Sequence, residues 1–496
     1  MYLLTRIRET AETTPQRLAV IEDGRALTYD RFWRLICACA DDLAPRISRS
    51  GIVVAAVTSR TEGWLLSLAL RSLGRDVCVI LSAEHLAVFE ALDVAAFITL
   101  SSAADPGFAP AGVPHLRLPP PSALAIDARS PLPPLPASDA FGAQILLTSG
   151  TTGQNKAFRA ADAGTEASVS RRRAGFGALG DDFRQFSEDM VLTVLDMGLW
   201  TSSAHTMPAE VWSEGGGVHF QSTSDLAGAF RWPTLTHAVV TPWHLARLVA
   251  EPAGAYPYNA DLQLIAGAGA VPQWLAREAL RKLSSRILIA LGSTEAGGWA
   301  LTPVRGEEDL RWHRLVPERR VEVVDDAGNP APPGTLGRLR VDMMTGQSQA
   351  YLGDAKSSET AFEDGWFYPG DLAVLDGRGR LALHGRATDV VSIAGEKRVV
   401  APWEAALQEK LACEGVCILA GQAPGEDEKL HVFIESRRPL TRAALEEAMR
   451  STLHGFPEVT AHKLEALPRT PTGKIRRIDL ARQLFGPAPT PAPAGT

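Results

Sequence analysis

The chain has 496 residues, more than one hydrophobic core usually serves, so we expect at least two domains. The hydrophobic share is 45%, the charged share is 22% and the formal net charge is −7, a balance that is typical of a globular protein and disfavours binding to nucleic acid or to an anionic membrane. The five cysteines are few and odd in number, which argues against a disulfide framework, and no second Cys/His pair follows Cys413 and Cys417 at zinc-site spacing.

The N-terminal sequence predicts a soluble, cytoplasmic protein. The segment MYLLTRIRETAETTPQ becomes charged too early for a secretory signal. The most apolar stretch, GWLLSLALRSLG, is interrupted by Arg71 well short of the length of a membrane span. We therefore expect neither a signal peptide nor a membrane-spanning helix.

The first part of the chain predicts α/β layering. The short apolar segments GIVVAAV at 51–57 and DVCVIL at 76–81 indicate strands, and WLLSLALRSL between them indicates a helix. Residues 105–137 are so rich in proline that we predict an extended surface connection there.

The pattern changes at residue 318, where short strands and turns predict a β-rich subdomain that continues to 385. A hairpin (DVVSIAGEKRVV), a helix with Pro402 in its first turn (APWEAALQEKL), two strands (CILAG and LHVFIES) and a second helix (TRAALEEAMRSTL) are predicted beyond it. The predicted fold class is α/β, with a large N-terminal domain at 1–385 made of layered α/β subdomains and a β-rich subdomain at about 301–385. A small mobile α+β domain at 386–484 and a disordered tail at 485–496 complete the expected organisation.

The segment LLTSGTTGQNKAF, residues 146–158, predicts a polyphosphate-binding loop after a strand. The hydroxyls of Thr148, Ser149, Thr151 and Thr152 can donate to phosphate oxygens, Gly150 and Gly153 let the backbone approach an oxyanion, and Lys156 adds a positive charge. The spacing differs from the G-x-x-x-x-G-K-[ST] loop, and Ala157 replaces its metal-binding hydroxyl. The alternative is a purely structural polar turn.

Three further segments follow in order: LIALGSTEAGG at 288–298, FYPGDLAVLDGRGRLALHGRATDVVSIAGEKR at 367–398 and LPRTPTGKIRR at 467–477. Together with the first loop they resemble the motifs of the adenylate-forming superfamily, which contains acyl-CoA synthetases, adenylation domains of nonribosomal peptide synthetases and firefly luciferase. The resemblance starts at TPQRLAVIEDGRALTYDRF and covers nearly the whole chain. Four ordered motifs are far more specific than any one of them.

The resemblance implies ATP and Mg²⁺ as cofactors and assigns nucleotide-binding residues. In the family the first loop binds the β- and γ-phosphates, which here implies Thr148, Ser149, Gly150, Thr151, Thr152, Gly153 and Lys156. The adenosine is then implied to lie against Gly267, Ala268, Gly269, Ala270, Leu291, Gly292 and Ser293. Asp371 matches the carboxylate that grips the ribose hydroxyls, and Arg386 matches an arginine near the ribose and phosphate.

The resemblance also implies catalytic residues and two domain poses. Lys474 matches a mobile lysine that reaches the substrate carboxylate and the α-phosphate, and Thr294 and Glu295 complete the implied catalytic set, with Glu295 as the magnesium ligand. The C-terminal domain then rotates, and the loop around Gly395 serves the thiol-transfer pose. The implied reaction is activation of a carboxylic acid to an acyl-adenylate and its transfer to a thiol.

Three positions depart from the family pattern. Leu291 stands where an aromatic ring usually stacks on adenine, Thr388 stands at the usual Asp or Lys hinge, and Gln154-Asn155-Lys156-Ala157 replaces the commoner Pro-Lys-Gly ending. These departures keep open a non-catalytic nucleotide-binding relic. Against a relic stand Glu295, Asp371, Arg386 and Lys474 together.

The acid pocket is predicted around the segment LDMGLW, which resembles the F-D-x-S-x-W of amino-acid-activating domains. Asp196 could pair with a substrate ammonium, and the alternative is that Asp196 caps the helix that follows. Trp200, Trp243, Gly298 and Trp299 are predicted to line a short, aromatic pocket that favours a small or aromatic acid.

The thiol acceptor must be a separate molecule, because no carrier domain follows the catalytic module in this sequence. We favour CoA, which predicts an acyl-CoA synthetase. The alternative is a standalone amino-acid adenylation enzyme that loads a free-standing phosphopantetheinyl carrier protein.

Overall fold

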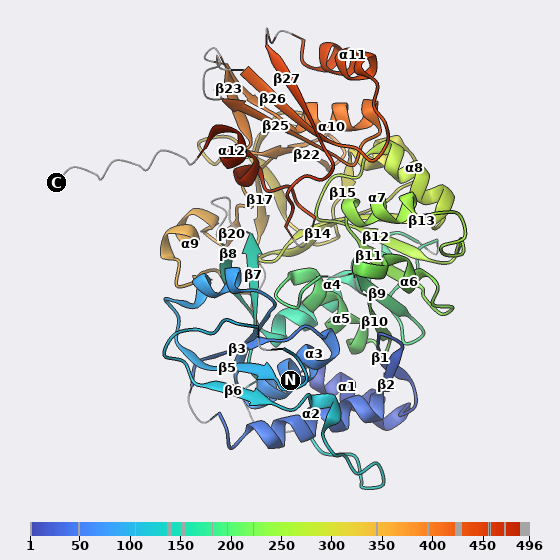
Figure 1. Cartoon of the computed structure of the whole chain (residues 1–496), viewed down its shortest axis with the longest axis vertical. Helices are drawn as coiled ribbons and strands as arrows, with labels where there is room; N and C mark the ends of the chain where they lie inside the picture. Colours follow the sequence, from blue (N-terminus) through green and yellow to red (C-terminus); the bar gives the residue numbers. More distant parts are fainter. Residues whose placement is uncertain are drawn as a thin grey trace, which may run out of the picture.

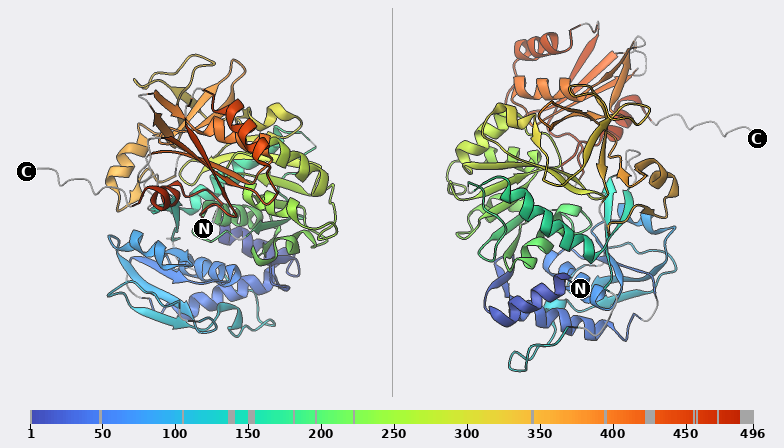
Figure 2. Two further views of the ribbon diagram at one scale, coloured as in Figure 1. Left: turned by 45° about the horizontal axis from the view of Figure 1, so that its top comes forward. Right: turned by 180° about the vertical axis from the view of Figure 1, so that it is seen from behind.

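The computed structural model of the chain describes residues 2–47, 50–104, 106–135, 141–149, 155–180, 182–195, 197–221, 223–343, 346–393, 396–421, 429–454, 456, 458–470 and 473–486. Figure 1 shows the N-terminal strands and helices at one end of the molecule and the last strands and helices at the other, and the rear view in Figure 2 shows the same order. The mixed α/β architecture confirms the predicted fold class.

The first sheet runs in the order β14-β13-β12-β11-β9-β10-β1-β2. Neighbours from β13 to β1 are parallel, and the edge strands β14 and β2 are antiparallel to their neighbours. Apolar runs such as VLTVL and HAVV, which are almost entirely buried, explain why these segments form interior strands. The strands are β1 (Leu18–Glu22), β2 (Arg25–Thr28), β9 (Val191–Leu195), β10 (Gly217–Gln221), β11 (His237–Val240), β12 (Gln263–Ala266), β13 (Arg286–Ser293) and β14 (Gly297–Pro303).

The second sheet runs in the order β18-β8-β7-β4-β3-β5-β6 and confirms the strands predicted at 51–57 and 76–81. Its strands are β3 (Ile52–Ala56), β4 (Asp76–Ile80), β5 (Val94–Leu100), β6 (His115–Leu118), β7 (Gln144–Ser149), β8 (Asn155–Ala160) and β18 (Tyr351–Leu352). The description of 105–137 as an extended surface connection was wrong in part. Residues 115–118 form the edge strand β6, because HLRL lies between prolines and places Leu118 in the core.

Helices pack between and around these two sheets. The α-helices are α1 (Tyr2–Thr13), α2 (Tyr29–Leu43), α3 (Arg60–Ser72), α4 (Asp162–Gly177), α5 (Ser202–Ser213), α6 (Leu226–Phe230), α7 (Pro242–Ala250) and α8 (Gln273–Lys282). Short 3₁₀ turns are η1 (Ala83–Phe89), η2 (Pro121–Ala123), η3 (Thr223–Asp225) and η4 (Glu307–Leu310). The predicted helix in WLLSLALRSL is α3, which is confirmed. Among the described helices, none is both long and apolar enough to cross a membrane.

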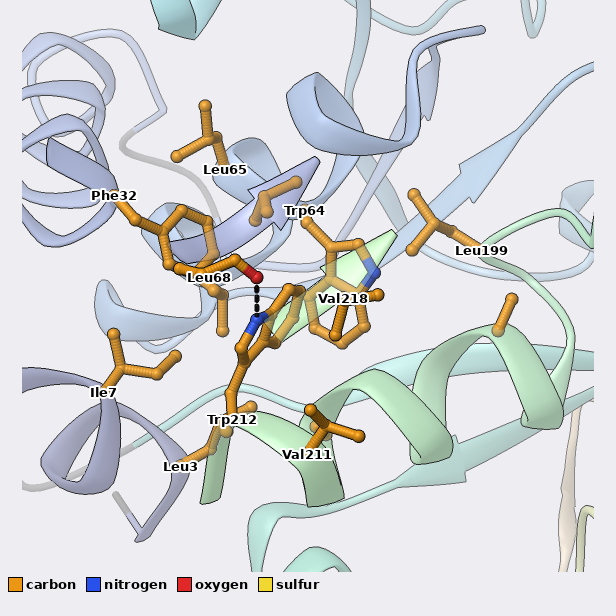
Figure 3. Close-up of a cluster of buried hydrophobic side chains, with 14 of the residues drawn as sticks. Leu3, Ile7, Phe32, Trp64, Leu65, Leu68, Leu199, Val211, Trp212 and Val218 are labelled. Atoms are coloured by element: carbon orange, nitrogen blue, oxygen red, sulfur yellow. Dashed lines mark hydrogen bonds between the residues drawn. The ribbon is translucent and has the colours of Figure 1, made fainter. Parts of the chain in front are cut away.

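The main core lies between the two sheets and gathers apolar side chains from both of them and from α1, α2, α3 and α5. Figure 3 shows its centre, where the Trp64 and Trp212 rings meet edge to face with centroids 4.8 Å apart. The indole N–H of Trp212 donates to the Ala19 carbonyl at 2.8 Å, so this fully buried ring keeps its hydrogen bond. This core holds the two sheets in a defined relative position, and the candidate site lies at the ends of their strands.

The third sheet runs in the order β15-β22-β21-β17-β20-β19, with β16 paired to β17. Its neighbouring strands are antiparallel, which confirms the short strands and turns predicted between 318 and 385. The elements are β15 (His313–Arg314), β16 (Val321–Val324), β17 (Gly337–Asp342), β19 (Phe362–Glu363), β20 (Trp366–Phe367), β21 (Asp371–Leu375), β22 (Arg380–Arg386) and helix α9 (Ala355–Ala361).

The C-terminal elements form a separate small module, which we call the C-terminal module (residues 387–486). It has the hairpin β23 (Val390–Ile393) and β24 (Glu396–Val399), the sheet β25 (Gly415–Gly421), β26 (Lys429–Glu435) and β27 (Val459–Leu464), and the helices α10 (Ala401–Leu411), α11 (Arg442–Thr452) and α12 (Arg477–Phe485). The predicted hairpin and both predicted helices are confirmed, and Pro402 lies in the first turn of α10. The division of the chain at 385 stays a prediction. The disordered tail was predicted to begin at 485, but Phe485 ends α12, and the part of the tail beyond 486 lies outside the described residues.

Candidate active site

A large cleft of about 2190 Å³ lies where the first and second sheets, the third sheet and the C-terminal module meet. The structure brings most of the residues singled out in the sequence to its wall: Thr148, Lys156, Trp200, Trp243, Gly267, Ala268, Gly269, Ala270, Leu291, Gly292, Ser293, Thr294, Glu295, Gly298, Trp299, Asp371, Arg386 and Lys474. Ser149 ends β7, and Gly150, Thr151, Thr152, Gly153, Asp196 and Gly395 lie outside the described residues.

One wall of the cleft consists of the carboxyl ends of the parallel strands β11, β12 and β13. The loop Gly267–Ala270 leaves β12 here, and the Gly267 N–H donates to the Val240 carbonyl at 3.0 Å. A Cβ on Gly267 would lie 3.2 Å from the Ala290 carbonyl, so a side chain here would crowd the close approach of the loop to β13. Ala268 adopts φ +65°, a conformation that costs a non-glycine residue roughly 1 to 2 kcal/mol. Strained backbone at strand ends is typical of ligand sites.

The hairpin between β13 and β14 carries Glu295. Gly292 pairs with Gly298, and a Cβ on Gly292 would lie only 2.7 Å from the Gly297 carbonyl, so the GSTEAGG sequence is what allows this tight reversal. The Ser293 hydroxyl accepts from the Ala296 N–H at 3.0 Å and closes the turn. The turn holds Glu295 at the cleft wall with only 5% of its surface exposed.

Tyr351 joins this turn to the strand after the phosphate-loop candidate. Its hydroxyl donates to Glu295 Oε1 at 2.7 Å, and Lys156 Nζ lies 4.7 Å from the centre of its ring. Tyr351 reaches this place because β18 pairs with β8, opposite Phe158. Burial and the Glu295 carboxylate raise the pKa of Tyr351, so the hydroxyl stays protonated and able to donate. Tyr351 therefore fixes one oxygen of the Glu295 carboxylate.

Asp371 and Arg386 face each other although they are far apart in the sequence. Asp371 begins β21, Arg386 ends β22, and the antiparallel pairing sets them opposite, with Arg386 Nε 3.5 Å from Asp371 Oδ1. The hairpin reverses at Asp376, whose Oδ1 accepts from the Arg378 and Arg380 N–H groups at 2.8 and 2.9 Å. Burial raises the pKa of Asp371, and the Arg386 and Lys474 charges oppose that rise.

Lys474 is carried into the cleft by a tight turn of the C-terminal module. The Thr470 N–H donates to the Lys474 carbonyl at 2.8 Å, and the Thr470 hydroxyl accepts from the Lys474 N–H at 3.1 Å. Arg469 anchors the turn through Nη2, 2.6 Å from Glu435 Oε2 on β26. The Lys474 side chain is accessible from the cleft, yet surrounding protein atoms, and then Arg386, lower its pKa, while Asp371 and Glu295 act to raise it.

The tryptophans predicted for the acid pocket differ in their surroundings. Trp200 and Trp299 lie at the cleft wall but are only 6% and 3% exposed, so each ring mostly packs into a core. Trp243 lies under the Lys474 turn, since a Cβ on Gly473 would lie 2.9 Å from the Trp243 Cβ. It therefore lies where the C-terminal module meets the first sheet.

The suggestion that Asp196 caps the following helix was wrong. Helix α5 begins at Ser202, and its N-cap is Thr201, whose side chain accepts from the Ala204 N–H at 3.4 Å. The N-cap is the residue directly before the first helical residue, which for α5 is Thr201, and Asp196 itself lies outside the described residues.

The model of the AMP-binding enzyme family matches residues 7–346. The chain belongs to the AMP-binding enzyme family. This places it in the adenylate-forming superfamily, as the four ordered motifs predicted.

Curated members of the family are similar to this chain over part or most of their length. The chain is 27% identical over 353 residues to the indoleacetate–CoA ligase of Aromatoleum aromaticum (68% of this chain and 66% of that protein). It is 25% identical over 269 residues to the fatty acid–acyl-carrier-protein ligase ScoC of Streptomyces coeruleorubidus (51% and 50%), so it spans about half of that relative. It is 27% identical over 520 aligned positions to novobiocin biosynthesis protein H of Streptomyces niveus (95% and 81%).

Solved structures share the fold over nearly the whole chain. The o-succinylbenzoate CoA synthetase MenE from Bacillus subtilis has a TM-score of 0.78 at 20% identity, covering 96% of this chain and 97% of that chain. The amide bond synthetase McbA from Marinactinospora thermotolerans has a TM-score of 0.74 at 18% identity, covering 96% and 99%. At these identities the likeness concerns the fold.

In this AMP-binding enzyme, a carboxylate of the C-terminal module caps a helix of the first sheet. Glu409 on α10 accepts from the Trp274 N–H at 3.0 Å and from Arg277 Nη2 at 3.1 Å. Helix α8 begins at Gln273 with Pro272 as its N-cap, and proline offers no side-chain acceptor, so Glu409 serves the helix terminus from outside. This contact joins the C-terminal module to α8 beside the first sheet.

Sequence reasoning missed Tyr351, Glu409 and, on α4, Arg171. The only hint of Tyr351 in the sequence was its position in QAYLGD. The only hint of Glu409 was that Pro272, the residue before α8, has no side chain that could cap this helix. For Arg171 the sequence offered only three consecutive arginines, and no helix was predicted there.

Proposed function

We propose that the chain is an AMP-forming carboxylate ligase, which activates a carboxylic acid with ATP and passes the acyl group to a thiol. The observation that carries the proposal is the position of Lys474. Lys474 lines the cleft and interacts electrostatically with Arg386, Asp371 and Glu295, although it belongs to the C-terminal module and these three residues do not. Such a convergence of charged groups suits a reaction between two anions.

The proposed first step joins the acid to AMP. A carboxylate oxygen of the acid attacks the α-phosphorus of ATP, and the bond from that phosphorus to the oxygen of pyrophosphate breaks. Lys474 lies where it can neutralise charge that develops on the α-phosphate, and Asp371 can accept from two neighbouring ribose hydroxyls. The loop Gly267–Ala270 at the cleft wall has only small side chains and leaves room for the flat adenine ring, with Leu291 as an aliphatic contact.

The residues of the Glu295 turn fit a magnesium ion. Tyr351 occupies Oε1 of Glu295, and within the described residues Oε2 accepts no hydrogen bond. Mg²⁺ prefers one or two carboxylates together with substrate phosphates, and Glu295 would supply one such carboxylate. Bound Mg²⁺ would neutralise the charge of the phosphates.

In the proposed second step a thiol sulfur attacks the acyl carbon, and the bond from that carbon to the AMP oxygen breaks. We favour CoA as the thiol and a small or aromatic acid, which the similarity to the indoleacetate–CoA ligase supports. A free-standing carrier protein is the second candidate acceptor, supported by the similarity to ScoC. The use of Gly395 in this step stays a prediction from the sequence.

An amino-acid substrate depends on Asp196. If Asp196 pairs with an α-ammonium, Asp196→Ala should cost an amino acid about 10²-fold in kcat/KM and cost its des-amino analogue little. If the wild type activates aryl or short acyl acids and no amino acid, that role of Asp196 is excluded.

The test is pyrophosphate exchange over a panel of fatty, aromatic, dicarboxylic and amino acids, followed by product analysis with CoA or a phosphopantetheinyl carrier protein. The proposal expects AMP, pyrophosphate and a thioester. ADP and phosphate as products would contradict it. Binding of ATP without exchange for any acid would support a non-catalytic relic instead.

A further inference from the structure

Helix α4 carries three consecutive arginines, and two of them have carboxylate partners on the neighbouring helix α5. Arg172 Nε donates to Glu210, which also accepts from Ser168. Arg173 forms a double hydrogen bond with Glu214, at 2.8 and 2.7 Å. Figure 1 shows α4 and α5 beside each other, and their residues are in contact.

Arg171 is the exception. Its side chain forms no hydrogen bond and no ion pair with any residue that the structure describes, and its Nη1 is shielded from solvent without a partner there. The side chain lines the cleft. A Cβ on Gly297 would lie 3.3 Å from Arg171 Nη2, so the guanidinium rests against the start of β14, directly after the Glu295 turn.

The charges around Arg171 do not supply its counter-ion. The charged groups that act on it are Arg319, Glu210, Arg172 and Asp342. Glu210 is held by Arg172, and Asp342 lies 3.5 Å from Nη1 of Arg319, whose Nη2 donates to the Ala296 carbonyl at 3.0 Å. The cluster therefore has three guanidinium groups for two carboxylates.

Burial, followed by the charge of Arg319, lowers the pKa of Arg171 to about 10, so the group is still a cation at neutral pH. A cation held in a partly buried place without a partner is costly, and binding an anion removes that cost. A guanidinium also presents a planar fork that matches a carboxylate with two parallel hydrogen bonds.

A second donor lies nearby on β14. Trp299 follows Gly297 by two residues, lines the cleft and is buried, and its indole N–H has no acceptor in the part of the chain that the structure describes. Thr294 and Glu295 form the turn between β13 and β14, and the strand ends of β12 and β13, where we place the nucleotide, precede it. We assign the donors on β14 and α4, which lie past this turn, to the acid.

We propose that Arg171 binds a second carboxylate of the acid substrate, so that the enzyme selects a dicarboxylic acid and activates the carboxyl group that lies away from Arg171. This assignment rests on the ligase function proposed above. In it Arg171 is a specificity-determining residue, and the acid is distinguished from its monocarboxylic analogue by a charged hydrogen bond that the analogue cannot make.

The test compares matched acids in matched variants. Pyrophosphate exchange is measured with the C3 to C6 α,ω-dicarboxylic acids and the three benzenedicarboxylic acids, each beside the monocarboxylic acid that lacks one carboxyl group. We expect the wild type to prefer a diacid, and Arg171→Gln to lower kcat/KM for that diacid by about 10²-fold while changing its monoacid by less than about threefold. Arg173→Gln, on the same helix but with a half-exposed guanidinium outside the residues that line the cleft, is the control and should keep the preference.

A stability measurement separates substrate binding from a structural role. Removing a cation that has no described partner should leave the Tm of Arg171→Gln equal to or above that of the wild type. The preferred diacid, added with AMP, should raise the Tm of the wild type and of Arg173→Gln but not of Arg171→Gln.

Four outcomes would overturn the assignment. A wild type that prefers monoacids would exclude a second carboxylate. An equal loss for diacid and monoacid in Arg171→Gln would place Arg171 at the nucleotide or the reacting carboxylate. A lower Tm of the variant with an unchanged acid preference would make it structural. The absence of exchange with every acid, amino and fatty acids included, would remove the ligase function itself and this assignment with it.

Discussion

The two sides of the cleft are built differently. The side that we propose for the nucleotide consists of turns at strand ends, such as Gly267–Ala270 and Gly292–Glu295. The side that we propose for the acid uses long side chains of helices, above all Arg171 on α4 with Glu210 of α5 behind it. Turns bind the nucleotide, which is the same in every reaction cycle, through backbone groups and short side chains. A site made of long helix side chains can acquire a different acid preference through a single substitution. We therefore expect substitutions on the two sides to separate catalytic rate from acid preference.

The largest effect is expected for Lys474→Ala. The variant should lose about 10²-fold or more in pyrophosphate exchange for every acid, because the charge contact is made mainly in the transition state. Thioester formation from a supplied acyl-adenylate should be much less affected. The exposed Lys463 of the same module supplies the control, Lys463→Ala, which should keep both rates. Equal losses in both half-reactions of Lys474→Ala would contradict its role in the adenylating pose.

Gly395 should give the opposite pattern. A bulky residue there is expected to spare exchange and to slow thiol transfer, because a pantetheine arm needs close approach to the backbone. Rates of both half-reactions measured in Gly395→Trp test this, and slower exchange with normal transfer would reject the two-pose mechanism.

A smaller effect is expected for Tyr351→Phe. The substitution removes the hydroxyl that donates to buried Glu295, and an unsatisfied carboxylate oxygen costs about 1 to 3 kcal/mol. We expect about tenfold slower exchange and a changed dependence on Mg²⁺ concentration, with the preference among acids unchanged. Tyr258→Phe removes an exposed hydroxyl and is the control. A changed acid preference in Tyr351→Phe would break the separation between the two sides.

Glu409→Gln should weaken only the contact that positions the C-terminal module against α8. It weakens the cap on α8 and the ion pair with Arg277, a loss of about 1 kcal/mol, so exchange should fall about fivefold and thiol transfer should not fall. Glu278→Gln removes a surface pair with Arg281 on the same helix and should leave exchange unchanged. Slower transfer in Glu409→Gln would show that this contact does not belong to the adenylating pose.

The smallest effect concerns pH. Enclosure by protein and the Arg386 charge lower the pKa of Lys474, and the reaction needs its charged form, so activity is lost as pH rises through the lowered value. The alkaline limb of the exchange rate should therefore lie below the ordinary lysine pKa of 10.5. Lys474→Arg should remove this limb. A limb that persists in Lys474→Arg, measured where circular dichroism shows both proteins folded, would assign it to another group.

The residues of the proposed nucleotide side could be named from the sequence because short ordered motifs carry them, and their roles were implied by the resemblance to the adenylate-forming superfamily. The glycines of GSTEAGG permit a tight hairpin, so this segment indicates both the turn and the carboxylate that the turn carries. Asp371 and Arg386 are 15 positions apart, yet one hairpin with the DGRG reversal brings them together. Each of these contacts forms within one hairpin, so the structure places the residues together with no pairing over long sequence separations.

The acid side and the domain contacts could not be predicted because they depend on pairing across long separations. Arg172 and Glu210 are 38 residues apart, and Trp274 and Glu409 are 135 apart. Three arginines in a row indicate only a charged helix until the structure shows which of them have partners. The strand β6 in the proline-rich segment was missed for a similar reason, since an edge strand gains its pairing from β5 and not from its own short sequence.

The most direct test of the central claim follows an oxygen isotope. The acid is labelled with ¹⁸O in both oxygens of its reacting carboxyl group, and the enzyme turns over with Mg²⁺, ATP and the thiol acceptor. Attack of the carboxylate on the α-phosphorus, followed by cleavage of the bond between the acyl carbon and oxygen, leaves one ¹⁸O in AMP and none in pyrophosphate. Mass analysis that finds one ¹⁸O per AMP supports the account, and unlabelled AMP or label in phosphate would contradict it.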